Sequence, residues 1–348
     1  MNSNWFWHCK FNNKQVRNYI PFNEVEEKFK TKIFVFSDIG DLDIEKYINE
    51  PYDFYVLMQT ESNSTANVLR IIEKYKDRVI VLGNVLLSNT PLSLDNENFF
   101  YSGDWLQSPL YREHPLHNLK LCRREYDFDF LLGRQDEFRD YLYNCFKGKG
   151  ILDRSLYSYC RNNNIHRFDV ETNRLISKKN ISSVRTIQNI YSDEKIDLSA
   201  FCSDNLASLL PMAISRITPK EIYKHSFASI VRETCFGDFT KNIFVTEKTA
   251  KPIWAKRLFF PIANQNFCKA LEEIGFNLYH DYSYYDSEPD YITRVDKFTE
   301  YILSLNSENL IKMYKNNLTN IDYNYRFVSK KNWTQEGFNF VMNRLSSL

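Results

Sequence analysis

One α/β unit can be read directly from the second half of the chain. Phe227 to Val231 is an apolar run of strand length, and it ends in the charged pair Arg232-Glu233. After a polar loop, Thr246 stands where a helix N-cap is expected, and a helical pattern follows it. Leu258 to Ile262 is a second apolar run of strand length. A strand, a helix and a further strand in this order predict a parallel sheet with a helix packed against it.

The same alternation of apolar runs and helical patterns covers much of the 348-residue chain. It predicts further strands at Lys32–Phe36, Tyr52–Met58, Val79–Leu82, Phe99–Tyr101, Phe128–Leu132 and Asn277–His280. Predicted helices cover residues 65–76, 138–146, 206–217, 267–274, 291–305, 307–321 and 334–345. In a chain long enough for two ordinary domains, this order predicts an α/β fold with two Rossmann-like domains. We place the first domain at residues 1–120 and the second at residues 121–330.

Charged residues gather where the predicted strands end and the helices begin. Arg232 and Glu233 follow one strand, and Glu247 and Lys248 open the helix that Thr246 caps. Ligands of open α/β sheets bind at the carboxyl ends of the strands, and the free N–H groups of a helix start attract phosphate. A carboxylate can accept two ribose hydroxyls, and a lysine at a helix start adds charge to a phosphate site. The alternative is an ordinary capped helix with a solvated Glu-Lys pair.

The residues Phe244-Val245-Thr246-Glu247-Lys248 resemble the donor-site signature of the α1,3-fucosyltransferases. Thr246 to Pro252 also resemble a Thr-Glu-Lys-Thr-x-Lys-Pro form from a broader group of phage and bacterial GT-B glycosyltransferases. The resemblance implies a GT-B fold, in which two Rossmann-like domains face each other across a cleft. It also implies a nucleotide-sugar donor, carrying UDP or GDP. Glu247 would hold the ribose and Lys248 would face the diphosphate.

Three further residues are candidates for the donor site. Arg232 and Glu233 are expected to line the pocket beside the helix start. Arg134 follows the first strand of the second domain, where a guanidinium could fork onto a diphosphate and neutralise the leaving nucleotide. The alternative for Arg134 is a surface pair with Asp136 or Glu137.

The general base is expected in the first domain. An inverting transferase needs a carboxylate to take the proton of the acceptor hydroxyl as its oxygen attacks the anomeric carbon. Glu61 follows a predicted strand and, with Ser62, resembles the start of the Glu-Ser-Pro motif that supplies the proposed base in fucosyltransferases. Asp38, at the end of the preceding strand, is the second candidate; for both, the alternative is a solvated loop carboxylate. The resemblance also implies that the last helix, in residues 331–348, returns to this domain.

No catalytic metal or other cofactor is expected. Asp127-x-Asp129 and Asp41-x-Asp43 match the Asp-x-Asp pattern of metal-using glycosyltransferases, but GT-B enzymes usually work without a catalytic metal. The seven cysteines have no zinc spacing and are expected to be free thiols in a reducing compartment. The N-terminus lacks the apolar core of a signal peptide, and no apolar run approaches the roughly 20 residues of a membrane span. We therefore expect a cytoplasmic protein, in the host cytoplasm if a phage encodes it.

Two acceptors are compatible with the sequence. One is 5-hydroxymethylcytosine in phage duplex DNA, with arabinose as a candidate sugar, and the other is a surface glycan or a lipid-linked sugar. The phage-like form of the motif favours DNA, whereas the net charge of +1 does not. Cationic partners for DNA phosphates would be His114, His117, Lys120, Arg123, Arg124, Lys330 and Lys331. A non-catalytic nucleotide-binding protein on the same fold is the remaining alternative.

Overall fold

The computed structural model describes residues 22–37, 53–59, 65–75, 78–87, 93–103, 106, 124–132, 136–160, 170–172, 220–234 and 242–347. Within them the chain is an α/β protein with parallel sheets, which confirms the fold class that the alternating pattern predicts. The chain forms two compact units. The first unit comprises Met1–Trp105, Lys241–Val245 and Lys331–Leu348, and the second comprises Leu106–Thr240 and Thr246–Lys330.

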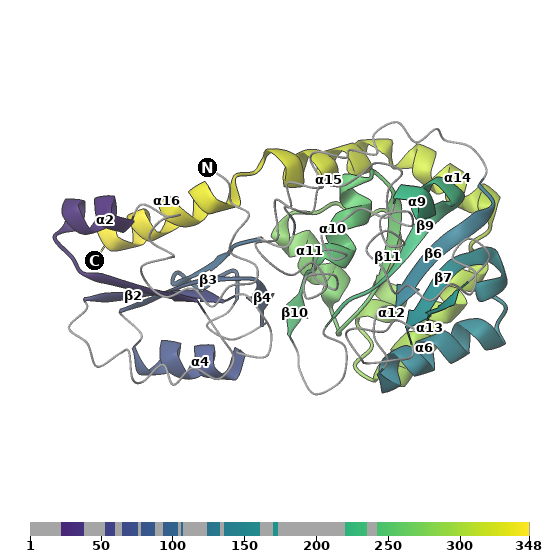
Figure 1. The fold of residues 1–348 in the computed structure, drawn as a ribbon, viewed down its shortest axis with the longest axis horizontal. Helices are drawn as coiled ribbons and strands as arrows, with labels where there is room; N and C mark the ends of the chain where they lie inside the picture. Colours follow the sequence, from purple (N-terminus) through teal and green to yellow (C-terminus); the bar gives the residue numbers. More distant parts are fainter. Residues whose placement is uncertain are drawn as a thin grey trace, which may run out of the picture. The chain divides into compact units, whose positions relative to one another are not determined.

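A four-stranded parallel sheet forms the centre of the first unit (Figure 1). Its strands lie in the order β1 (Ile33–Ser37), β2 (Phe54–Gln59), β3 (Val79–Gly83) and β5 (Phe99–Tyr101). The register pairs Ser37 with Met58, so β1 and β2 end at the same edge of the sheet. The same unit contains an antiparallel pair, formed by β4 (Val85–Leu86) and β10 (Ile243–Phe244).

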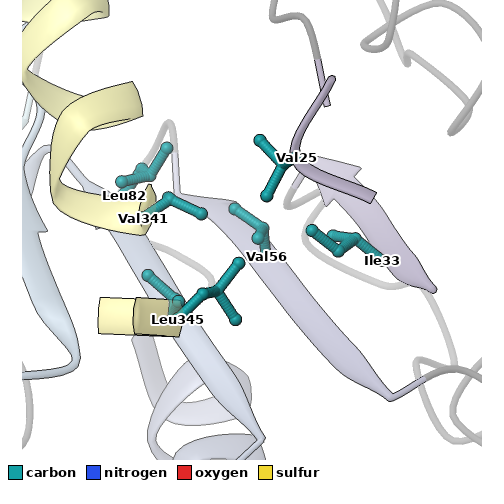
Figure 2. Close-up of a cluster of buried hydrophobic side chains, with 7 residues drawn as sticks. Val25, Ile33, Val56, Leu82, Val341 and Leu345 are labelled. Carbon is teal, nitrogen blue, oxygen red and sulfur yellow. The ribbon is translucent and has the colours of Figure 1, made fainter. Parts of the chain in front are cut away.

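Helices cover both faces of this sheet. The helix α4 (Thr65–Lys74) lies on one face, and α2 (Phe22–Phe29) and α16 (Trp333–Ser346) lie on the other (Figure 1). Figure 2 shows the core that α2 and α16 share with the strands. This core consists of Val25, Ile33, Val56, Ile80, Leu82, Val341 and Leu345. The helix nearest the C-terminus thus completes a core whose strands come from the first hundred residues.

Gly103 lets the chain pass close to Trp333, the first residue of α16. Its φ is +56°, and an added Cβ would lie 2.6 Å from an atom of the Trp333 ring. The Lys331 ammonium also lies against this ring, 3.9 Å from its centroid. A glycine is therefore required here by both the backbone conformation and the space.

A five-stranded sheet forms the centre of the second unit. Its strands lie in the order β11 (Leu258–Ile262), β9 (Ser226–Arg232), β6 (Tyr126–Leu132), β7 (Ser155–Cys160) and β8 (Val170–Thr172). The first four are parallel and β8 is antiparallel. After β6, the chain adds β7 on one side and then β9 and β11 on the other. The position between β6 and β9 is therefore a topological switch point, where open α/β sheets bind ligands.

Helices connect and cover these strands. Their bounds are α6 (Glu137–Gly148), the 3-10 helix η4 (Leu152–Arg154), α9 (Lys220–His225), α10 (Glu247–Trp254), α11 (Phe267–Ile274), α12 (Ser283–Asp286), α13 (Tyr291–Ser304), α14 (Ser307–Asn316) and α15 (Leu318–Lys330). Aromatic rings link β6, α6 and α13, because Phe146 packs on Phe130 and on Phe298 at centroid distances of 4.8 and 6.3 Å. Among the described residues, no helix has both the length and the apolar character needed to cross a membrane.

A buried ion pair holds the sheet of the second unit together. Arg257, just before β11, donates to Asp129 of β6 at 2.7 Å. The same carboxylate oxygen accepts from Ser226 and Ser229 of β9, each at 2.9 Å. Burial raises the pKa of Asp129, against the opposing effects of the Arg257 charge and the hydroxyl donors. Asp127 accepts a hydrogen bond from α14 instead, so the two carboxylates of the Asp-x-Asp pattern serve separate internal contacts.

Two predicted elements differ from the observed ones. Residues 277–280 form no strand. Instead, the Asn324 side chain makes hydrogen bonds with the backbone N–H and the backbone carbonyl of Asn277, each at 2.8 Å. A neighbouring strand would otherwise have to satisfy those groups. The helix expected over residues 307–321 is two helices, α14 and α15, which are separated at Asn317, the C-cap of α14.

Candidate functional site

The carboxyl ends of β6 and β9 meet at the switch point of the second sheet. The register pairs Phe130 with Ile230, so the chain leaves both strands at the same edge. β9 ends at Arg232, which is followed by Glu233. β6 is followed, after residues 133–135, by Asp136, which is the N-cap of α6.

Arg232 joins the two sides of this edge. Its guanidinium donates to both carboxylate oxygens of Asp136 at 3.3 Å, and to the carbonyl oxygens of Glu233 and Thr234 at 2.7 and 3.1 Å. Arg139, in the first turn of α6, donates to Asp136 as well. Burial, and after it the charge of Arg139, lowers the pKa of Arg232 to about 10. The guanidinium therefore stays protonated at neutral pH and braces the end of β9 against the start of α6.

Glu233 connects the end of β9 to the start of α10. Its side chain is fully buried, with 0% exposure. One carboxylate oxygen accepts from the Thr246 backbone N–H at 3.1 Å and from the Thr249 hydroxyl at 2.6 Å. The other accepts from the Thr246 hydroxyl at 2.5 Å and from the Thr234 backbone N–H at 3.2 Å. These bonds compensate for burying the carboxylate and tie the first turn of α10 to the sheet.

Thr246 is the N-cap of α10, at the position that the sequence predicts. Its hydroxyl donates to Glu233 and accepts from the Lys248 backbone N–H at 3.3 Å. The Lys248 ammonium donates to the Thr234 hydroxyl at 2.9 Å and to a Glu247 carboxylate oxygen at 2.8 Å. The Lys248 side chain is 30% exposed, so its charge can reach an anion at the helix start.

Glu247 lies between two lysines of α10. It pairs with Lys248, and Lys251, four residues further along the helix, supplies a second positive charge. Burial would raise the pKa of Glu247, but the charges of Lys248 and Lys251 outweigh it, and the pKa is lowered. Glu247 is therefore ionised at neutral pH and can act as a hydrogen-bond acceptor. Burial also lowers the pKa of Lys251 to about 8, although the charge of Glu247 opposes this shift.

The structure brings five of the expected donor-site residues together at this edge. Arg232 and Glu233 were expected to line a pocket. Both side chains are buried and make hydrogen bonds within the protein. They therefore stabilise the start of α10. Thr246 caps the helix, and Glu247 and Lys248 carry the accessible charges.

Other expected site residues lie outside the described part of the chain. These are Asp38, Glu61, Arg134, His114, His117, Lys120 and Arg123, together with the Asp41-x-Asp43 pattern. Asp38 follows β1 directly and Glu61 comes shortly after β2. Because β1 and β2 end together, the chain leaves both strands at one edge of the first sheet.

Two of the three remaining cations expected to meet DNA, Arg124 and Lys331, make contacts within their own units. Arg124 is half-buried and donates to the backbone carbonyl of Lys224. Lys331 lies over the Trp333 ring and pairs with Glu336 at 3.3 Å. Lys330 is exposed at the end of α15. The Arg124 side chain is therefore engaged in a hydrogen bond within the second unit and is not a fully exposed cation.

Arg139 was not singled out from the sequence, and Thr249 and Lys251 were included only as part of the Thr-Glu-Lys-Thr-x-Lys-Pro form, with no role assigned to them. The spacing of each residue could have indicated its contact, because side chains three or four positions apart lie on the same helix face. Arg139 follows its N-cap by three residues, Thr249 follows Thr246 by three, and Lys251 follows Glu247 by four. Their burial, however, could not be read from spacing.

A second helix start near this edge is closed by the chain itself. The helix α11 follows β11, and two N–H groups of its first turn, those of Cys268 and Lys269, donate to the Asp286 carboxylate at 3.0 and 3.2 Å. Burial raises the pKa of Asp286 to about 6, although both bonds act to lower it. An internal carboxylate therefore takes the position that an external anion would occupy at α11.

The described residues contain no group of three or more His, Cys, Asp or Glu side chains that could hold a metal ion. No family model, curated protein or solved structure matches the chain. What the protein does is therefore inferred from the geometry at the start of α10 and from the motif that occupies it.

Proposed function

We propose that the chain is an inverting GT-B glycosyltransferase, which moves a sugar from a UDP- or GDP-sugar to an acceptor hydroxyl. One observation carries the proposal: the residues that resemble the donor-site signature open a helix that is tied to β9, at the carboxyl edge of a parallel sheet. Two compact α/β units, each built on a parallel sheet, support the GT-B assignment.

The first turn of α10 would hold the donor nucleotide. Glu247 is ionised and can accept two ribose hydroxyls. Lys248 can exchange its hydrogen bond with the Thr234 hydroxyl for one with a diphosphate oxygen. The positive end of the α10 dipole adds to the favourable potential for phosphate. This division of roles matches the one that the resemblance implies for Glu247 and Lys248.

The transfer step needs a base, which we assign to Glu61, with Asp38 as the second candidate. The carboxylate takes the proton of the acceptor hydroxyl while its oxygen bonds to the anomeric carbon. The bond from that carbon to the donor phosphate breaks, and the nucleoside diphosphate leaves with the electron pair. Lys248 stabilises the charge that develops on the leaving group. Attack opposite the leaving group inverts the anomeric centre.

As the acceptor we propose the hydroxymethyl group of 5-hydroxymethylcytosine in duplex DNA, with arabinose as the candidate sugar. The phage-like Thr-Glu-Lys-Thr-x-Lys-Pro form of residues 246–252 supports this choice. For its hydroxymethyl group to reach the catalytic carboxylate, the nucleotide would be flipped out of the duplex. Contacts with the neighbouring phosphates would make the affinity fall steeply with added salt.

The direct test is transfer of labelled sugar from UDP- and GDP-sugars. Three acceptors are compared: duplex DNA with hydroxymethylcytosine, the same duplex with unmodified cytosine, and a lipid-linked sugar. We expect label only on the hydroxymethylated duplex. Label only on the lipid-linked sugar would overturn the DNA proposal and leave the donor site in place. Nucleotide binding with no transfer to any acceptor would instead identify a non-catalytic nucleotide-binding protein.

A further inference from the structure

The buried Glu233 carboxylate accepts hydrogen bonds from both threonines of the motif in residues 246–252. The hydroxyls of Thr246 and Thr249 donate to Glu233 at 2.5 and 2.6 Å, one to each carboxylate oxygen. The backbone N–H groups of Thr234 and Thr246 complete the set at 3.2 and 3.1 Å. None of these four donors carries a charge. A fully buried carboxylate held only by neutral donors loses much of its compensation when one hydroxyl is removed.

The carboxylate also determines how the Thr246 hydroxyl is oriented. A hydroxyl has one proton to donate and two lone pairs to accept. Because the Thr246 proton is directed to Glu233, its lone pairs face the Lys248 backbone N–H at 3.3 Å and the Lys248 ammonium at 3.4 Å. The conformation of Lys248 therefore depends on Glu233 through one intervening side chain.

We propose that Glu233 is a positioning residue of the donor site, acting through Thr246 and Thr249 to hold Glu247 and Lys248 ready for the nucleotide. The inference rests on the proposed nucleotide-binding function, and it explains why the motif needs hydroxyls at positions 246 and 249. Both hydroxyls donate to one carboxylate, that of the residue that follows β9, and so join the end of that strand to the first turn of α10. Glu233 itself does not touch the ligand.

A second network in the same unit provides a matched comparison. Ser229 also donates a hydroxyl to a buried carboxylate, that of Asp129, at 2.9 Å. That carboxylate pairs with Arg257, just before β11, and makes no hydrogen bond to α10 among the described residues. Ser229→Ala and Thr249→Val each remove one hydroxyl from a buried carboxylate. Only Thr249→Val should affect the helix start.

The experiment measures two properties of the full chain for wild type, Thr249→Val, Thr249→Ser and Ser229→Ala. The first is the affinity for UDP and GDP, by calorimetry. The second is amide hydrogen exchange in the peptide that covers the first turn of α10. We expect Thr249→Val to weaken nucleotide affinity about tenfold or more, as for a lost hydrogen bond to a charged group, and to speed exchange in that peptide. Thr249→Ser should restore both values, and Ser229→Ala should change neither by more than about twofold.

Equal effects of Thr249→Val and Ser229→Ala on affinity and on exchange would overturn the proposal, because the Glu233 contacts would then contribute only general stability. If wild type binds neither nucleotide, the proposed function fails. The exchange measurement alone then decides whether Glu233 orders the first turn of α10. Faster exchange confined to Thr249→Val would still support the ordering of the first turn of α10 by Glu233, and unchanged exchange would refute it. If Thr249→Val does not fold, Thr249→Cys takes its place, because the thiol has a similar size and is a weaker donor.

Discussion

Lys251 is buried in the second half of α10, where a charged side chain is costly. Burial lowers its pKa from 10.5 to about 8 despite the nearby Glu247 charge. A shift of this size corresponds to a penalty on the charged form of roughly 3 kcal/mol. Because the folded pKa is below the unfolded one, the penalty is fully present below pH 8. It is relieved as the pH rises from about 8 to 10.5. Loss of stability at one position is common where function needs the charge.

Lys251→Met should therefore stabilise the protein at pH 7, by about 1–3 kcal/mol, because it removes the buried charge and keeps the length of the side chain. The check is urea denaturation of wild type and variant at pH 7 and at pH 10. The difference between the two should shrink at pH 10, where wild-type Lys251 is largely neutral in the folded state. A variant that is less stable at pH 7, or a difference that does not change with pH, would contradict this account.

At the scale of helices and strands, local signals predicted the elements and long-range contacts decided the roles of the side chains. Apolar runs predicted β9 and β11, and a threonine at the N-cap position predicted the start of α10. The burial of Arg232 and Glu233 could not be predicted, because it depends on Asp136 and on threonines distant in the chain. The strand expected at residues 277–280 was wrong, and there the distant Asn324 hydrogen-bonds both backbone groups of Asn277.

The packing of α16 on the first sheet is tested at Gly103. Gly103→Ala combines a positive φ with a Cβ placed 2.6 Å from the Trp333 ring, so we expect a loss of about 2–4 kcal/mol in unfolding free energy. Gly148→Ala is the matched control. It adds the same methyl group at the last residue of α6, where a Cβ would meet nothing within 4 Å. Denaturation curves should show little change for that variant. Equal stability of the two variants would mean that Trp333 does not pack against Gly103.

At the scale of the whole molecule, the proposal gives each unit a part of the chemistry. The donor residues belong to the second unit, and the candidate bases follow strands of the first.

Glu61→Gln keeps the side-chain shape and removes its basicity, so turnover should fall by roughly two to four orders of magnitude. Nucleotide affinity should stay nearly unchanged, because Glu61 has no part in donor binding. Asp38→Asn is the comparison. Normal turnover in Glu61→Gln with a large loss in Asp38→Asn would transfer the role of base to Asp38.

The central claim is that the first turn of α10 binds the donor nucleotide, and calorimetric titration with UDP and GDP tests it most directly. The proteins compared are wild type, Lys248→Ala and Lys269→Ala. Lys269 is also in the first turn of a helix that follows a strand of the second sheet, but Asp286 closes that helix start.

We predict that wild type binds at least one of the nucleotides. Lys248→Ala should bind it ten- to a hundredfold more weakly, as for a lost charge-assisted hydrogen bond of about 1.5–3 kcal/mol. Lys269→Ala should match wild type. Absence of binding to wild type, or equal affinity in folded Lys248→Ala, would contradict the claim.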